Sequence, residues 1–477
     1  MIRTLHANPT RRRGAKTARS MDTIFSATVL LLTVLGLIMA YSTTFFWSQV
    51  KENSPFAIFG RQVAFATLGL LAFVVLSRLD YGIFRRYAIW IMVACLVAVI
   101  LVLLLGAVRF GAKRTFSEGS IQPSEAMKIA VIIYGAAWLA SRRDQVQSIA
   151  NGLLPFGVIV GVASFFVAIQ PDLSTAATIV IIAMVMFFMA GASWTQLLLV
   201  SGIAMGAFAL LFTVWPHASD RVNEFVQLWR DRSSDIEYHI WQSLVTLGGG
   251  GLFGTGIGAG GQKFGYLPTP HTDSVVAVLG EEMGLVGLML TLALFVLFTW
   301  RGLRIANEAD TPFGSFIVIG VVVWVISQML LNVLAMLAMI PFTGVPVPFL
   351  SVGGSSLVSL LAACGIVVSI SRGSRLMQDE DSDTALSRGN YAGQASNGVG
   401  GSFRASASVR GRHGGSRLTR AHRARRASAT SSQQDGADAT IVGRDVRVTG
   451  RLTQKPSRRN HSNTANTVRW RRGRDGT

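Results

Sequence analysis

Long runs of apolar residues, separated mostly by short polar segments, make up most of the chain between residues 22 and 371. A helix that crosses the hydrocarbon core of a bilayer needs about 20 predominantly apolar residues. The pattern therefore predicts an all-α polytopic integral membrane protein with about ten transmembrane helices. The ten runs lie near residues 22–45, 59–77, 87–108, 125–140, 152–169, 173–191, 195–215, 275–300, 313–340 and 349–371.

The positions of Lys and Arg predict how these spans are oriented, because basic residues favour cytoplasmic loops. An arginine triplet precedes the first run, and further basic residues follow the second, fourth, eighth and tenth runs. Ten spans with both termini in the cytoplasm place all of these residues on one side of the membrane. The longest loop, 216–274 between the seventh and eighth runs, is then extracytoplasmic.

Composition and charge separate a neutral body from two basic tails. Half of the residues are hydrophobic and 14% are charged, against about 25% in soluble domains, which excludes an ordinary soluble enzyme. The net charge of +19 comes from residues 1–21, with six basic and no acidic residues, and from residues 372–477, with 21 basic and eight acidic residues. We expect a basic N-terminal tail, a ten-span core at 22–371 and a disordered basic C-terminal tail, both tails cytoplasmic.

Several cations in the extracytoplasmic loops oppose the charge rule. Lys113 and Arg114 lie in the loop 109–124, and Lys263 lies in the longest loop. They could hold an anionic ligand, or they could pair with acidic residues nearby. Nine glycines in fourteen positions, 248–261, precede Lys263. Because no strand–helix context surrounds them, we expect these glycines to allow a sharp bend or a close approach to a ligand, rather than to bind a nucleotide.

Asp273 lies at the end of the same loop, immediately before the eighth apolar run. An aspartate is favoured at the N-terminus of a helix, so Asp273 could simply cap the eighth span. A carboxylate at the membrane surface, within reach of His271 and Lys263, could instead act as a general base. The residues alone leave both interpretations open.

Charged residues also lie within the predicted spans, where each needs a partner. Glu281 and Glu282 lie about two turns into the eighth run, Glu125 and Lys128 share the first turn of the fourth, and Arg61 lies in the second. Carboxylates inside a membrane are costly and are functional candidates for that reason. The alternatives are that the glutamates bridge neighbouring helices and that Glu125 pairs with Lys128 along one helix.

Five motifs together resemble the family of bacterial proteins for shape, elongation, division and sporulation, which includes FtsW and RodA. The resemblance covers about residues 22–371 and neither tail. The motifs are Gly111–Arg114 with Gln122–Lys128, Gln170–Ala176, Gln262–Asp273, Gly280–Gly284, and Pro341–Phe349 with Ser351–Ser356.

This resemblance implies a peptidoglycan glycosyltransferase that polymerises lipid II on the outer face of the cytoplasmic membrane. The aspartate of the family's His-Thr-Asp motif is catalytic, and it corresponds to Asp273, which would act as general base. The leaving pyrophosphate needs cations, for which Lys113, Arg114 and Lys263 are the candidates. The other predicted substrate-binding residues are Glu125, Lys128, His271, Glu282 and Arg61.

The resemblance also implies partners and a place in the cell. Its substrates would be lipid II and undecaprenyl-pyrophosphate-linked glycan, and its partner a class B penicillin-binding protein. The motif Gly36–Ser42 and the long basic tail favour the FtsW branch, and hence the division septum, over a RodA-like elongation polymerase. A lipid II flippase is a further alternative. The arginine-rich tail suits anionic membrane lipid or other division proteins rather than nucleic acid.

Three positions depart from the family pattern and concern how the glycan is held. Thr115 and Val352 replace a tryptophan and a tyrosine, and Ser274 replaces an aromatic residue after the catalytic aspartate. No cofactor or closed set of metal ligands is expected, although the pyrophosphate could recruit a divalent cation.

Overall fold

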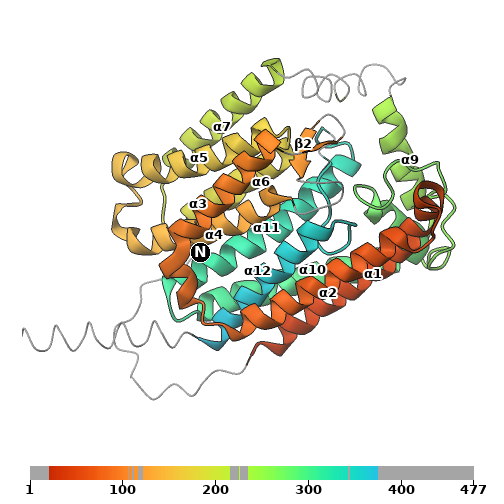
Figure 1. Ribbon diagram of the computed structural model, residues 1–477, viewed down its shortest axis with the longest axis horizontal. Helices are drawn as coiled ribbons and strands as arrows, with labels where there is room; N and C mark the ends of the chain where they lie inside the picture. The colour runs from red at the N-terminus through yellow and green to blue at the C-terminus, as the bar shows by residue number, and fades with distance from the viewer. Residues whose placement is uncertain are drawn as a thin grey trace, which may run out of the picture. The chain divides into compact units, whose positions relative to one another are not determined.

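The computed structural model describes residues 21–105, 107–109, 112–115, 122–214, 225, 235–341 and 344–373. This part of the chain is almost entirely helical (Figure 1). The two predicted tails lie almost wholly outside it. Its α-helices are α1 (Thr23–Glu52), α2 (Ala57–Arg78), α3 (Gly82–Leu105), α4 (Pro123–Ser141), α5 (Leu154–Ile169), α6 (Leu173–Met189), α7 (Trp194–Val214), α9 (Asp235–Gly249), α10 (Val275–Glu308), α11 (Pro312–Met336) and α12 (Gly354–Arg372).

Each of the ten predicted apolar runs coincides with one of these helices, and the all-α polytopic fold is confirmed. Among the described residues, seven helical segments are long and apolar enough to cross a membrane. They are α1, α2, α3, α10, α11, α12, and α5 together with the π-turn Ile149–Leu153 that precedes it. The apolar helical segments Leu173–Met189 and Trp194–Leu210 are shorter, and α4 is not among the seven, so the total of ten spans stays a prediction.

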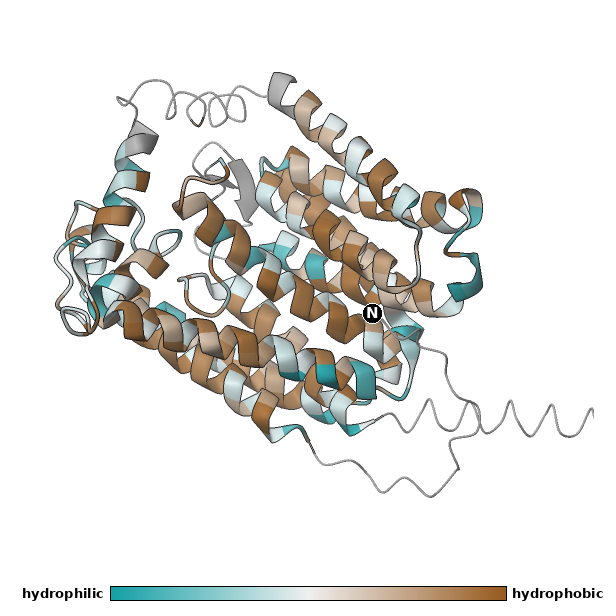
Figure 2. Ribbon diagram, turned by 180° about the vertical axis from the view of Figure 1, so that it is seen from behind, coloured by the Kyte–Doolittle hydropathy of each residue, from teal (hydrophilic) through white to brown (hydrophobic). Residues whose placement is uncertain are grey.

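Large apolar side chains are exposed along several of the helices. Trp90 and Leu104 of α3 are 71% and 66% exposed, and Val296 of α10 is 59% exposed. Apolar colour continues along the helices in Figure 2, whereas polar residues gather at helix ends and in loops. Apolar surface of this extent is rare on monomeric soluble proteins, and it is the surface that lipid covers.

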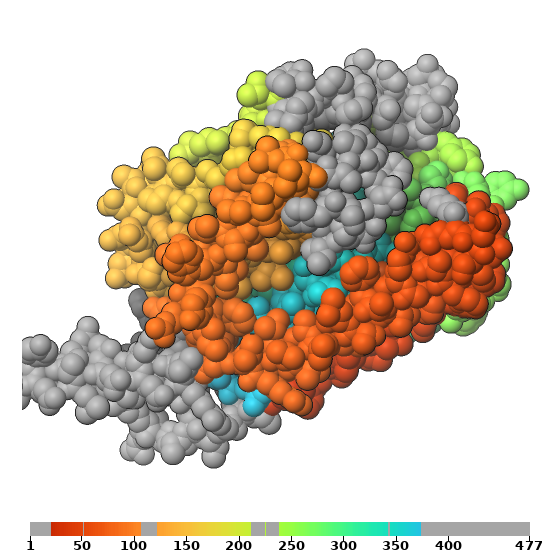
Figure 3. Space-filling view, viewed as in Figure 1, coloured from red at the N-terminus to blue at the C-terminus, as the bar shows by residue number. Residues whose placement is uncertain are grey.

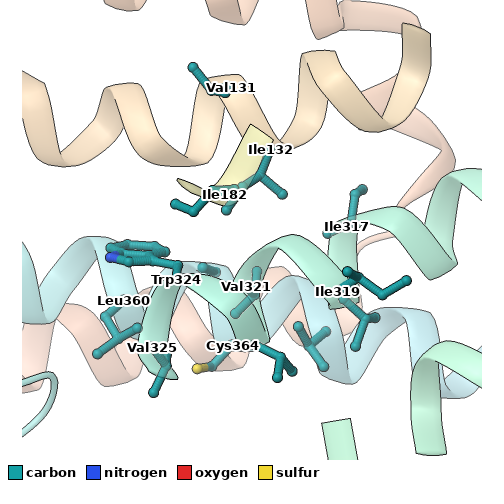
Figure 4. Close-up of a cluster of buried hydrophobic side chains, with 14 of the residues drawn as sticks. Val131, Ile132, Ile182, Ile317, Ile319, Val321, Trp324, Val325, Leu360 and Cys364 are labelled. Atoms are coloured by element: carbon teal, nitrogen blue, oxygen red, sulfur yellow. The ribbon is translucent and has the colours of Figure 1, made fainter. Parts of the chain in front are cut away.

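The interior of the bundle is built around α11, which packs against α4, α6, α10 and α12. Trp324 of α11 is completely buried, among Ile132 of α4, Ile182 of α6 and Cys364 of α12 (Figure 4). On one side of the bundle, α2 packs on α12 and α3 packs on α4. In the space-filling view, residues of α12, drawn in cyan, are visible between α2 and α3 (Figure 3).

The start of α1 and the end of α12 meet at one point. Asp22 caps α1 by accepting a hydrogen bond from the Phe25 amide at 2.9 Å. Its other carboxylate oxygen pairs with Arg301 of α10 at 2.7 Å, and its own backbone amide donates to the Ser371 hydroxyl at 3.3 Å. One aspartate therefore joins α1, α10 and α12.

The structure differs from the sequence-based expectation at the helix ends. α1 continues to Glu52 rather than ending near residue 45, and α12 begins at Gly354 rather than near residue 349. The residues before α12 are not helical because they bind the turn that precedes α10. A short antiparallel hairpin of β1 (Ala107–Arg109) and β2 (Ala112–Thr115), which was not predicted, follows α3.

Candidate active site

Asp273 lies in a turn that immediately precedes α10. The helix begins at Val275, and its N-cap residue is Ser274, whose side chain makes no capping hydrogen bond. The prediction that Asp273 lies at or just before a helix N-terminus is confirmed, but Asp273 is not the N-cap residue. Its side chain is partly exposed, which a group that acts on a ligand requires.

Two other elements hold the backbone of this turn. Asn332 of α11 donates from its side-chain amide to the Asp273 carbonyl at 2.9 Å. The Ser351 hydroxyl donates to the carbonyl of Thr272 at 2.6 Å, and the Val352 amide donates to the carbonyl of His271 at 2.9 Å. Three consecutive carbonyls are therefore bound from α11 and from the segment before α12. The motif that contains Ser351 fixes the motif that contains Asp273.

Ser274, one of the departures from the family pattern, is buried and faces α9. Its hydroxyl lies 2.9 Å from Nε2 of His239 and donates to the Pro268 carbonyl at 3.1 Å. Burial lowers the pKa of His239, and a hydrogen bond with the backbone of Pro268 partly opposes this shift. Ser274 therefore links α9 to the start of α10 rather than presenting a surface to a glycan.

Lys263 and Glu282 form a buried ion pair. The lysine Nζ lies 2.6 Å from the glutamate Oε1, and it also donates to the Ser42 hydroxyl and the Gly258 carbonyl, both at 2.8 Å. Lys263 is 2% exposed and Glu282 1% exposed. Three protein acceptors bind the Lys263 ammonium, and its predicted contact with pyrophosphate stays a prediction. Glu282 is bound within the protein in the same way.

The glycine-rich segment 250–262 wraps around a break in α10. Gly284 has φ +67° and ψ −167°, which no helix accommodates. Around it, the carbonyls of Glu281 and Glu282 accept hydrogen bonds from the amides of Thr255 and Gly256 at 2.9 and 3.0 Å. Loop amides also donate to both glutamate carboxylates. The close approach that glycine permits is made here to α10.

Glu125 and Lys128 form a second buried ion pair, on α4. Their charged atoms lie 2.8 Å apart, and Nζ of Lys128 lies 4.7 Å from the centre of the Trp324 ring. The side chains are 5% and 0% exposed, respectively. The pairing along one helix, predicted as the alternative to substrate binding, is present, and the predicted contact of the two residues with substrate stays a prediction. Nearby, Asp172 caps α6 and accepts a hydrogen bond from the Gln122 side chain at 3.0 Å, which joins α6 to the start of α4.

The remaining predicted site residues lie apart from these clusters or outside the described side chains. Arg61 lies near the start of α2, is exposed, and pairs with Glu52 at the end of α1. His271 contributes its carbonyl to the bracing described above, and its ring lies 6.5 Å from that of Trp47. The backbone of Lys113 and Arg114 belongs to β2, but their side chains are outside the described part of the structure. Their role stays a prediction.

Sequence reasoning missed Asn332, Ser42 and His239. Asn332 carried a usable signal, because it lies four residues after Gln328 and eight after Trp324 in an otherwise apolar run, which is one face of a helix. Ser42 and His239 carried no such signal, since their partners are distant in sequence. Within the described ranges, no cluster of three or more His, Cys, Asp or Glu residues is arranged to bind a metal.

Comparison with known proteins identifies the family. The family model described as "Cell cycle protein", for FtsW, RodA and SpoVE, matches residues 22–376. Stage V sporulation protein E of Bacillus subtilis strain 168 is 38% identical over 360 residues, which cover 75% of this chain and 98% of that protein. A protein of Geobacter sulfurreducens named "Probable peptidoglycan glycosyltransferase FtsW" is 33% identical over 362 residues, which cover 75% of this chain and 97% of that protein.

A solved structure has the same fold. It is described as "Structural coordination of polymerization and crosslinking by a peptidoglycan synthase complex", and its matching chain is 25% identical with a TM-score of 0.60. The match covers 74% of this chain and 98% of that one. Sequence, family model and fold agree, and the chain belongs to the FtsW, RodA and SpoVE family of cell cycle proteins.

Proposed function

We propose that this protein is a peptidoglycan glycosyltransferase that polymerises lipid II at the outer face of the cytoplasmic membrane, with Asp273 as general base. The observation that carries the proposal is the turn of Asp273, in which three consecutive carbonyls are bound while the aspartate side chain stays partly exposed. A backbone held in this way places a reacting group without further ordering. The names of the relatives support the same activity.

In the proposed reaction, an acceptor sugar hydroxyl attacks the anomeric carbon of the growing chain. The new glycosidic bond forms as the bond to undecaprenyl pyrophosphate breaks, and the Asp273 carboxylate takes the hydroxyl proton. The departing pyrophosphate carries the developing charge, which nearby cations stabilise. Lys113 and Arg114 are the proposed cations, because the ammonium of Lys263 is bound by protein acceptors.

The buried ion pairs have a supporting role in this proposal. Lys263 with Glu282 holds the glycine-rich segment on α10, and Glu125 with Lys128 lies against Trp324 in the middle of α11. Asp172 fixes the start of α6 next to the start of α4. These contacts join α4 to α6 and the glycine-rich segment to α10.

We further propose that the protein acts in cell division beside a class B penicillin-binding protein. The FtsW name of several relatives and the peptidoglycan synthase complex among the similar structures support this. The membrane would be the cytoplasmic membrane at the septum, with both termini in the cytoplasm, and the basic C-terminal tail would contact anionic lipid or other division proteins.

Polymerisation of labelled lipid II by the full chain with its penicillin-binding partner tests the proposal. Asp273→Ala and Asp273→Asn should lower the rate at least about 100-fold, because a general base typically contributes 10²–10⁴-fold. Glu308→Gln is the matched control, since Glu308 lies in an exposed pair with Arg304 at the far end of α10. Normal polymerisation by Asp273→Ala contradicts the assignment. Translocation of lipid II across vesicles without polymer would instead identify a flippase.

A further inference from the structure

A stripe of buried polar side chains runs along one face of α11. Trp324, Gln328 and Asn332 are spaced four residues apart, and they are 0%, 3% and 4% exposed. The Trp324 Nε1 donates to the Gln328 side-chain oxygen at 2.7 Å. At one end of the stripe, Trp324 lies against the Lys128 ammonium, and at the other end, Asn332 reaches the turn of Asp273. The stripe therefore joins the two candidate regions of the site through one helix.

Asn332 makes a pair of contacts that few other side chains can make. Its Nδ2 donates to the Asp273 carbonyl at 2.9 Å and to the Val345 carbonyl at 2.8 Å. Because both partners are acceptors, only the orientation with the NH₂ group toward them is favourable. The Asn332 Oδ1 is buried, and none of the described residues donates a hydrogen bond to it. The side chain therefore acts here through its two donated hydrogen bonds.

We propose that Asn332 is a positioning residue that sets where the Asp273 carboxylate stands relative to the substrate, a role that rests on the proposed function of Asp273. It binds two loops, the turn before α10 and the segment before α12, to one rigid helix. Trp324, two turns along the same face, is enclosed by the apolar cluster of α4, α6 and α12 (Figure 4). Both loops are therefore attached to a helix that is fixed in the buried interior of the bundle.

The contact matters for rate because the placement of a catalytic group is demanding. A displacement of about 1 Å can cost on the order of 100-fold in rate. Without the Asn332 amide, the carbonyls of Asp273 and Val345 lose a shared donor, and the turn loses this hydrogen bond to α11, while the contacts from Ser351 and Val352 remain. Asn332 itself is buried and does not touch the reacting atoms, so its loss should affect turnover more than substrate binding.

Asn332→Leu and Asn332→Asp remove both donors at similar volume, and Asn332→Gln keeps them on a longer side chain. The matched control is Thr291→Val, because Thr291 of α10 is buried and, among the described residues, its hydroxyl bonds only to the Gly287 carbonyl of its own helix. Polymerisation of labelled lipid II by the full chain with its partner gives kcat and KM over a range of pH. Thermal unfolding in detergent measures the folded fraction of each variant.

For Asn332→Leu and Asn332→Asp, we expect kcat to fall at least 10-fold with KM within about threefold, and the acidic limb of the pH profile to shift. Asn332→Gln should retain more activity than either, and Thr291→Val should resemble the unaltered chain. A kcat within twofold of the unaltered chain overturns the proposal. A loss of kcat that only follows the fall in the folded fraction, with an unchanged pH profile, also overturns the proposal.

Asp273→Asn, measured in parallel, separates this inference from the proposed function. If Asp273→Asn is inactive and Asn332→Leu is normal, only the positioning role is wrong. If Asp273→Asn polymerises lipid II normally, the general-base role is wrong, and the positioning role fails with it.

Discussion

Lys128 and Lys263 are buried almost completely, and each lies beside one glutamate. Removing two charges from water costs several kcal/mol per ion, which their attraction repays only with close geometry and further hydrogen bonds. Lys263 has these bonds, to Ser42 and to the Gly258 carbonyl. The pair with Glu282 therefore specifies how the glycine-rich segment lies on α10, more than it adds net stability.

Breaking this pair from one side should be strongly destabilising. Lys263→Met leaves Glu282 buried and unpaired, and we expect a loss of about 3–5 kcal/mol in the free energy of unfolding. Lys263→Met combined with Glu282→Gln should recover part of it, because the remaining side chain is neutral. Thermal unfolding in detergent measures both. Arg304→Ala, which breaks an exposed pair with Glu308, is the control and should change stability by at most about 1 kcal/mol.

His239 should make stability depend on pH. Burial lowers its pKa, so the unfolded chain binds a proton more readily than the folded chain does. The stability that neutral His239 contributes is present above its ordinary value of about 6.5 and is lost as the pH falls below it. Between pH 7 and pH 5, the melting temperature of the unaltered chain should fall more than that of His239→Gln. Parallel curves for the two proteins would show that His239 is not responsible.

At the scale of elements, the break in α10 divides the helix into two parts. The part that precedes Gly284 in sequence carries Glu281 and Glu282 and begins next to Asp273. Hydrogen bonds from the glycine-rich segment replace those that the helix loses: the amides of Leu285 and Val286 donate to the carbonyls of Gly251 and Leu252 at 3.0 and 3.1 Å. Irregular backbone inside a membrane protein needs such partners, because lipid offers none.

The close packing of this segment predicts different effects for two neighbouring glycines. A Cβ at Gly250 would lie 1.9 Å from the Gly280 carbonyl oxygen, whereas a Cβ at Gly248 meets nothing within 4 Å. Gly250→Ala should therefore cost about 1–3 kcal/mol or more, as overpacking does, and should lower polymerisation by moving the segment. Gly248→Ala, inside α9, should be neutral or slightly stabilising. Equal melting temperatures and rates for the two variants would contradict this packing.

The positions of the helices were predictable, because apolar runs of about 20 residues have few other structures in lipid. The break at Gly284 was not, since glycine is tolerated within transmembrane helices and the break depends on hydrogen bonds from residues 251–256. The sequence could not predict which group the Lys263 side chain binds either. A lysine before a membrane surface can equally face a ligand or a buried glutamate, and only the tertiary structure decides. Asn332 was missed as well, although its spacing from Gln328 and Trp324 carried a usable signal.

At the scale of the whole molecule, charge and chemistry lie in different parts of the chain. The excess of basic residues belongs to residues 1–21 and 372–477, whereas the candidate site uses residues of the neutral core. We expect deletion of residues 377–477 to leave lipid II polymerisation in vitro within about twofold and to reduce septal localisation of a fluorescent fusion. Loss of polymerisation on deletion, with the core still folded, would show that the tail belongs to the catalytic machinery.

The meeting of α1 and α12 at Asp22 has a consequence for chain connectivity. Because the Asp22 amide contacts the Ser371 hydroxyl at 3.3 Å, a short linker could join the two ends of the core without disturbing a helix. New termini could then be opened in an exposed loop, as circular permutation permits when chain ends are close. A chain whose helices follow one another in a different order could then fold to the same arrangement of helices in space.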